Sequence, residues 1–370
     1  MIKNMLAVPE PQEFLAAQFD EMITYLRDID QQTVRVSINS AADLEMGADG
    51  RLLSNSFALS PLAFHQICRH VSKGLWSLAT DIAGNNSGVR GFDSAVSIPL
   101  AVKIVNECIA LRFRAREGLI GRDMIQDHDA GVIVGVVGPR YQLLPNHQLL
   151  EVANDMMACH EVKMAFHGGT LVGRRMSVSY LTAEPLVTTT DGPMYGGVYF
   201  TNSEAGECAV SGATLLQLGH TRRCINKPRH LKHAGKDFFK RLSHMLGGAL
   251  HTWEKTVAVA HDYENVVAGE ANFLTPSNTI AKAPRAKLEA AFAEYVDKSV
   301  ANDVVRKVIF MGADGTHVPK NISHKDIATR RVRDIVLVAM SIANGHYPEV
   351  REGLERAAFD ILARKVKLRS

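Results

Sequence analysis

The chain of 370 residues lacks the sequence signatures of several common enzyme classes. The GxSxG motif of serine hydrolases and the HExxH motif of zinc proteases do not occur. The glycine-containing segments 135–138 and 168–170 lack the lysine with which a Walker A loop reaches a phosphate. The sequence therefore argues against nucleotide hydrolysis, and we expect no cofactor and no covalent chemistry.

Long apolar runs and paired cysteines are also missing. No run approaches the ~20 residues of a transmembrane helix, so we expect no contact with a membrane. The N-terminal segment has no long apolar core and is interrupted by Pro9 and Pro11, which is not the pattern of a secretory signal. The five cysteines are odd in number and include no CxxC pair, which indicates reduced thiols and a cytoplasmic location.

Acidic residues are almost absent from one segment, residues 220–244 (HTRRCINKPRHLKHAGKDFFKRLSH). It holds eight Lys or Arg and four His against Asp237 alone, a charge of about +7 in a chain whose net charge is only +3. A concentrated patch of this kind binds polyanions by releasing their counterions. Nucleic acid is the first partner to consider, and a solvated basic helix face is the alternative.

The spacing within this segment predicts a row of cations on a helix. Lys232, Lys236 and Lys240 lie four residues apart and would form one ridge, with Arg229 one turn earlier. Like charges in a row repel, so a phosphate backbone running along them explains the row better than the fold does. Of the neighbouring pair Phe238 and Phe239, one must face the core of such a helix. The other is free to contact a partner or stack on a base, although 6% aromatic content does not indicate extensive stacking.

The pattern of the remaining chain predicts an α+β fold. Apolar spacing indicates helices at 11–29, after Ser60–Pro61, at 98–113, in a long run from 231, and at 284–299, 324–344 and 348–367. Between 118 and 226, consecutive strand-like segments joined by short turns predict a central antiparallel meander with helices. We expect an N-terminal helical and hairpin region at 1–95, a nucleic-acid-binding core at 96–230 and a C-terminal helical region with a basic tail at 231–370. The glycine-rich stretch 84–94 is expected to be a loop.

Two groups of residues leave a metal site open as an alternative. Asp127 and Asp129 could serve a metal-dependent nuclease, although a polar turn is expected just before a strand and accounts for them better. His220, Cys224, His230 and His233 are residue types that zinc accepts. Their spacing lacks a CxxC or HxxxH pair, and the surrounding cations oppose a dication. We therefore predict no metal ligands.

Several short motifs resemble those of a family of phage- and plasmid-encoded proteins catalogued as domain of unknown function 932. They are LSPLAFHQICRHV, Arg140–Tyr141, Asn146, Gly173–Arg175 and Thr221–Asn226, over about residues 55–245. The chain departs from that pattern at Lys227–Pro228. The mixed order of strands, a hairpin and a basic helix is also similar to that of Redβ-type single-strand annealing proteins.

What the second resemblance implies is a ring or filament of identical subunits that holds one DNA strand in a basic groove, without a nucleotide cofactor. The groove would be lined by Arg174, Arg175, Arg222, Arg223, Lys227, Arg229, Lys232, Lys236 and Lys240. Whether a partner exonuclease supplies the single strands stays open. We therefore expect a homo-oligomer that binds and anneals single-stranded DNA in phage-type recombination. A structural or assembly protein of a mobile element and a metal-dependent nuclease are the alternatives, and the choice between DNA and RNA stays open.

Overall fold

The structure is a computed structural model. The residues that it describes are 10–47, 51–72, 74–82, 94–115, 119–219, 222–267, 270–271, 282–310, 330–346 and 348–363. The expected loop at 84–94 and the basic C-terminal tail lie almost entirely outside these ranges. No helix in the described part of the chain is long and apolar enough to cross a membrane.

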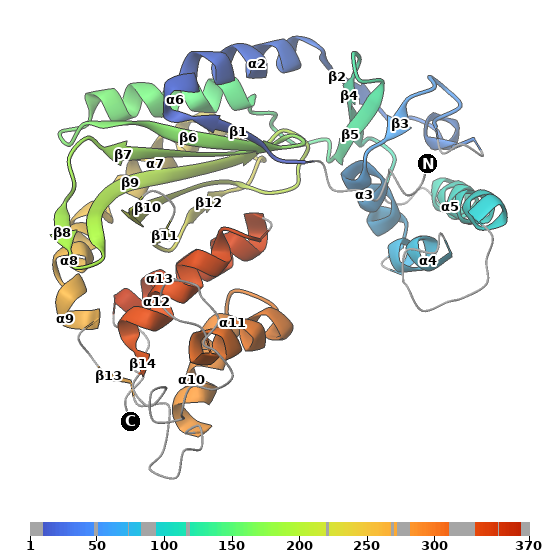
Figure 1. The fold of residues 1–370 in the computed structure, drawn as a ribbon. Coiled ribbons are helices and arrows are strands. Elements are labelled where there is room, and N and C mark those ends of the chain that lie inside the picture. Colours follow the sequence, from blue (N-terminus) through green and yellow to red (C-terminus); the bar gives the residue numbers. More distant parts are fainter. Residues whose placement is uncertain are drawn as a thin grey trace.

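An eight-stranded antiparallel sheet forms the centre of the molecule (Figure 1). Its strands are β1 (Gln12–Leu15), β6 (Met164–Val172), β7 (Arg175–Thr182), β8 (Val187–Thr189), β9 (Gly192–Ser203), β10 (Val210–Leu218), β11 (Arg222–Ile225) and β12 (Arg229–Leu231). They are ordered β1-β6-β7-β9-β10-β11, with β8 paired to β9 and β12 paired to β10. The expected α+β class, with an antiparallel meander and flanking helices, is confirmed.

Three helices cover one face of this sheet: α2 (Phe19–Gln31), α6 (Asn146–Cys159) and α7 (Phe238–Leu250). Alternate residues of the strands, such as Tyr180 and Phe200, are completely buried beneath them. The predicted helix at 11–29 is wrong at its start, because Gln12–Leu15 pairs with β6 and the α-helix begins only at Phe19. Gly169 permits this close packing, since a Cβ there would lie 2.6 Å from the sulfur of Met22.

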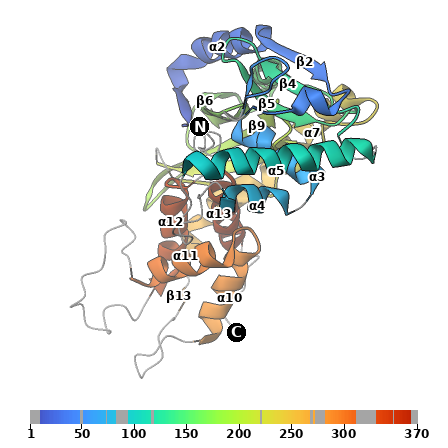
Figure 2. The ribbon, with the colours of Figure 1, turned by 90° about the vertical axis from the view of Figure 1, so that its right-hand side faces the viewer.

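Helix α8 (Trp253–His261) follows α7 on the same face, where the hydroxyl of Thr256 hydrogen-bonds to that of Thr214 on β10 at 2.7 Å. The later helices lie below the sheet in Figure 1, away from α2 and α6, and α10 to α13 are also seen in Figure 2. They are α9 (Tyr263–Val267), α10 (Lys282–Ala293), α11 (Lys298–Phe310), α12 (Val332–Ala343) and α13 (Pro348–Leu362), with the short strands β13 (Glu270–Ala271) and β14 (Arg330–Arg331) between them. Their core is continuous with Leu216 and Cys224 at the β10–β11 edge. The predicted helices in this region are therefore present, with shorter bounds for α10, α12 and α13.

A second, four-stranded sheet is built from β2 (Thr33–Ser37), β3 (Ala58–Leu59), β4 (Asp123–Asp127) and β5 (Val132–Val137). It packs with α3 (Pro61–Val71), α4 (Leu75–Ile82) and α5 (Ser94–Arg114). The N-cap predicted at Ser60 is confirmed, since its Oγ accepts a hydrogen bond from the amide of Ala63 at 3.1 Å. The hydrophobic cores divide the chain differently from the expected boundary at 95/96: β4 and β5 belong with the N-terminal region, whereas β1 and α2 belong with the central sheet.

Candidate nucleic-acid interface

The basic segment lies at one edge of the central sheet and then turns into α7. The strands β11 and β12 both pair with β10 alone, so together they form the edge strand, interrupted at 226–228. The predicted helical ridge of Lys232, Lys236 and Lys240 is therefore wrong. Residues 229–231 are held as a strand by the backbone of β10, and α7 begins only at Phe238. Gly235 and Asp237 adopt positive φ angles of 98° and 59°, which a continuous helix cannot contain.

Six cationic side chains of this segment are exposed, and we call them the basic edge: Lys227, Arg229, Lys232, Lys236, Lys240 and Arg241. In the part of the chain that the structure describes, none of them forms an ion pair with a carboxylate. The guanidinium of Arg229 packs against Gly248 of α7, and that of Arg241 donates a hydrogen bond to the carbonyl of Ala234. These contacts hold the strand, the turn and both ends of α7 together.

An exposed aromatic ring lies within the basic edge. Phe238 is buried at 3% exposure and stacks on His233, whereas its neighbour Phe239 is 56% exposed. This confirms that one of the two rings faces the core and the other faces outward. A shallow hollow of about 380 Å³ adjoins the ring and is lined by Gln142, Gly235, Lys236, Asp237, Phe238, Phe239 and Lys240. A flat apolar ring between two lysines is suited to stacking on a base whose phosphates the lysines hold.

Two of the arginines assigned to the groove by resemblance are not at this surface. Arg174 and Arg175 are buried at 6% and 5% exposure, and they form ion pairs with carboxylates from distant parts of the chain. Arg223 is half-buried, with its Nε 3.0 Å from Glu355 and its guanidinium over the ring of Tyr199. Arg222 is also half-buried. The expectation that all nine residues line one groove is therefore wrong for Arg174 and Arg175, because the fold uses their charges internally.

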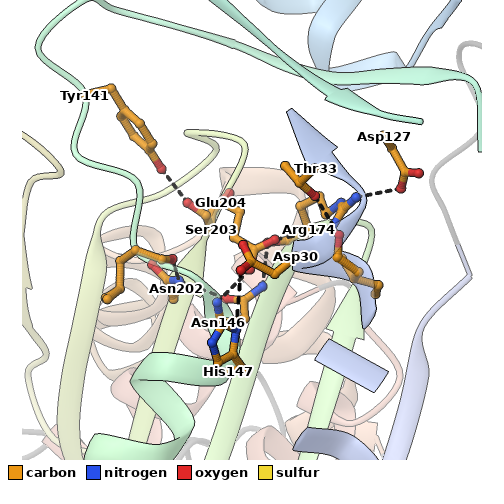
Figure 3. A network of polar contacts seen from close by, with 12 residues as sticks. Asp30, Thr33, Asp127, Tyr141, Asn146, His147, Arg174, Asn202, Ser203 and Glu204 are labelled. Carbon is orange, nitrogen blue, oxygen red and sulfur yellow. Dashed lines mark hydrogen bonds and ion pairs between the residues drawn. The ribbon is translucent and has the colours of Figure 1, made fainter. Parts of the chain in front are cut away.

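Arg174 belongs to a buried polar network that joins the two sheets (Figure 3). Its guanidinium lies 2.5 Å from Oδ2 of Asp127 on β4 and 3.4 Å from Oε2 of Glu204, just beyond β9. The other oxygen of Glu204 accepts the amide hydrogen of Asn146 at 2.6 Å, at the first residue of α6. The side-chain amide of Asn202 donates to Oδ1 of Asn146 at 2.9 Å. The network therefore fixes α6, the β6–β7 turn and the second sheet relative to one another.

Glu204 is the titratable centre of this network. Burial raises its pKa from 4.5 to about 7, against the opposing effects of the Asn146 amide and the Arg174 guanidinium. Since the folded protein then binds this proton more tightly than the unfolded chain, stability is lost as the pH rises from about 4.5 through about 7.

We expect Glu204→Gln to remove this pH dependence, because an amide keeps an acceptor for the Asn146 N–H without a titratable proton. The free energy of unfolding of the variant, relative to that of the natural chain, should rise by about 3 kcal/mol between pH 4.5 and pH 8. Urea unfolding at several pH values measures the difference. Parallel pH profiles for the two proteins would show that Glu204 does not titrate in this range.

The residues considered for a metal site are used otherwise or lie apart. Oδ1 of Asp127 accepts the amide of Ala130 at 3.0 Å, while its other oxygen binds Arg174. Cys224 and His233 are buried, His230 is exposed, and His220 lies outside the described residues. Among the described residues no group of three or more His, Cys, Asp or Glu side chains could hold a metal ion.

Comparisons of the chain with protein-family models, with curated proteins and with solved structures found no match. The two resemblances drawn from the sequence therefore stay predictions. The surface itself was largely signalled by the run of basic residues. What the sequence did not signal is the hollow beside Phe239, because Gln142 reaches it from 90 or more positions earlier in the chain.

Proposed function

We propose that the protein binds single-stranded nucleic acid along the basic edge and anneals complementary strands as a homo-oligomer. The observation that carries the proposal is an exposed phenylalanine, Phe239, beside Lys236 and Lys240 and next to a hollow of about 380 Å³. Unpaired bases stack on such rings, whereas the bases of a duplex are stacked on each other and cannot. The lysines and arginines of the basic edge supply the electrostatic part of the binding.

The opposing interpretation is that the charges protect the sheet. An unpaired edge strand invites another chain to pair with it, and lysines on such an edge prevent this. A structural or assembly protein would need no more than that. Salt distinguishes the two, because binding through six phosphate contacts on a single strand should weaken about 300-fold between ~50 and ~200 mM salt. An apolar assembly should not weaken in this way.

The test is fluorescence anisotropy of a labelled single-stranded oligonucleotide and of the matching duplex, at both salt concentrations and with EDTA present. We expect binding that prefers the single strand and falls steeply with salt. EDTA should leave it unchanged, because no metal ion takes part. Binding to neither form would overturn the proposal and favour edge protection. Loss of binding with EDTA, or cleavage without it, would favour the nuclease.

Phe239→Ala should weaken binding of the single strand by about 1–3 kcal/mol, because one base loses its stacking partner. The dependence of affinity on salt should stay the same, since no charge is removed. Leu111→Ala is the matched control, because Leu111 is similarly exposed, at 58%, but lies on α5. Equal affinities for the Phe239 variant, the control and the natural chain would show that no base stacks on Phe239.

Annealing requires that two strands meet on the protein. Mixing two complementary labelled oligonucleotides, each coated with the protein, should speed duplex formation relative to the naked strands. Size-exclusion chromatography with light scattering, with and without the oligonucleotide, measures the assembly. Tight binding without faster pairing would keep the binding function and reject the annealing.

A further inference from the structure

A cavity of about 750 Å³ lies between the central sheet and the segment that joins α12 to α13, well inside the size range of small-molecule sites. Six strands line one side of it: β1, β6, β7, β9, β10 and β11. Asn344, His346, Arg351 and Glu352 line the other. The cavity contains none of the residues of the basic edge, so it is a separate feature of the molecule.

The floor of the cavity is unusually polar for the face of a buried sheet. Ser177, Ser179, Tyr199 and Gln217 all line it, and the latter three are 6% exposed or less. The hydroxyl of Tyr199 donates to Oγ of Ser177 at 3.1 Å, so the hydrogen of the Ser177 hydroxyl is left to donate elsewhere. Burial also raises the pKa of Tyr199, which keeps its hydroxyl protonated. The hydroxyl of Ser179 donates to the carbonyl of Gly168 at 3.4 Å, and the amide of Gln217 donates to the carbonyl of Gly219 at 3.2 Å. Ser177 is therefore the hydroxyl of this floor that can donate a hydrogen bond to a polar ligand.

Two arginines meet at one end of the cavity. The Nε atoms of Arg223 and Arg351 both lie 3.0 Å from the same oxygen of Glu355, a residue only 1% exposed. Arg223 is further held by the ring of Tyr199, 4.6 Å from its guanidinium carbon. One carboxylate thus orients two cations. Among the described residues, the remaining guanidinium N–H groups of this pair have no hydrogen-bond acceptor.

The carboxylate of Glu352 also lines the cavity, where it lies 3.9 Å from Arg175 and is attracted to Arg223 as well. Arg175 is shared with Glu207, which is also 3.9 Å away. Glu13 is exposed on the edge strand β1. Among the described residues, only Glu355 accepts hydrogen bonds from the arginine pair, so both guanidiniums keep N–H groups that an anion can accept. Arginine pairs of this kind bind the oxygens of a phosphate through several parallel hydrogen bonds.

We propose that this cavity binds a small phosphate ester, with the phosphate on Arg223 and Arg351 and the polar body of the ligand against Ser177 and Ser179. The volume suits a molecule of the size of a nucleoside monophosphate or a sugar phosphate. The inference goes beyond the proposed nucleic-acid binding and does not depend on it, because the two sets of residues do not overlap.

The test is isothermal titration calorimetry of the full chain with adenosine 5′-monophosphate, ribose 5-phosphate, inorganic phosphate and unphosphorylated adenosine. We expect saturable binding of at least one of the two esters and none of adenosine. Arg351→Gln should weaken that binding at least tenfold, and Ser177→Ala should weaken it less. Arg351 is suited to substitution because its side chain is 30% exposed, and circular dichroism with thermal unfolding confirms that each variant folds.

Lys236→Gln is the matched control, because it removes one charge from the basic edge and should leave the ester affinity unchanged. The absence of heat with both esters, or equal affinity in the Arg351 variant, would overturn the site. Equal binding of adenosine and its monophosphate would overturn the phosphate assignment. Failure of the nucleic-acid proposal is seen separately, in the binding of an oligonucleotide by the natural chain.

The same phosphate chemistry could belong to a free metabolite or to the end of a strand. If a 5′-phosphorylated oligonucleotide displaces the bound ester and its unphosphorylated form does not, the site binds the 5′ end of a nucleic-acid strand. Displacement by neither oligonucleotide assigns it to a free metabolite. In either case the phosphate is bound in the cavity by Arg223 and Arg351.

Discussion

Replacing Lys232, Lys236 and Lys240 together with glutamine should weaken binding of a single-stranded oligonucleotide about 100-fold at ~0.1 M salt. Each phosphate contact on a single strand contributes about −0.7 to the slope of log affinity against log salt concentration. At ~0.1 M salt, losing one contact therefore lowers the affinity roughly fivefold. The slope of the triple variant should therefore be smaller by about 2. Fluorescence anisotropy over a series of salt concentrations measures both quantities. The fold should tolerate the changes, since all three side chains are exposed.

A matched variant separates local contacts from net charge. Lys298, Arg306 and Lys307 on α11 can be changed to glutamine in the same way, which lowers the net charge equally at a site away from the basic edge. We expect this control to retain most of the affinity of the natural chain. If both triple variants lose affinity equally, the nucleic acid responds to total charge and the basic edge is not its binding site.

Arg174→Leu should destabilise the protein by about 3–5 kcal/mol, the largest effect on stability that we predict for a single charged residue here. The change leaves Glu204 and Asp127 without the cation between them, and Glu204 is 2% exposed. A buried carboxylate that loses its cation keeps most of its desolvation cost, and the smaller leucine side chain offers only dispersion contacts in exchange. Urea unfolding followed by circular dichroism measures the loss.

Arg27→Leu provides the comparison for a surface pair. Arg27 lies 2.5 Å from Glu151, as close as Arg174 to Asp127, but the two side chains are 55% and 36% exposed. Solvent screens such a pair, and its removal should cost less than about 1 kcal/mol. Similar losses for the two variants would mean that burial does not distinguish them.

The same Arg174 variant also tests the groove that the resemblance to annealing proteins implies. Where the variant is folded, for example at low temperature, its affinity for a single-stranded oligonucleotide should equal that of the natural chain. A loss of affinity in the folded variant would mean that Arg174 reaches the nucleic acid after all, and that the buried ion pairs open on binding.

The α+β class, the antiparallel meander and most of the helices were determined by local patterns in the sequence. Ser60 and Pro61 start a helix because a serine oxygen can accept a free amide hydrogen and proline suits the first turn. The split between Phe238 and Phe239 follows from helix geometry, since adjacent residues of a helix cannot both face the core. The cluster of cations at the surface was likewise visible as a run of charge.

Tertiary structure alone decided which of those cations are exposed, which are buried in ion pairs, and which secondary structure carries them. Residues 229–231 have helical spacing around them but become a strand, because the backbone of β10 offers hydrogen bonds there and Gly235 and Asp237 then turn the chain. Arg174 and Arg175 resemble surface cations in the sequence. They are buried because carboxylates arrive from three separate parts of the chain, and only the complete fold brings these within 4 Å of them: Asp127 on β4, Glu204 and Glu207 between β9 and β10, and Glu352 on α13. A pairing between residues this far apart depends on how whole elements pack, which no local pattern of the sequence records.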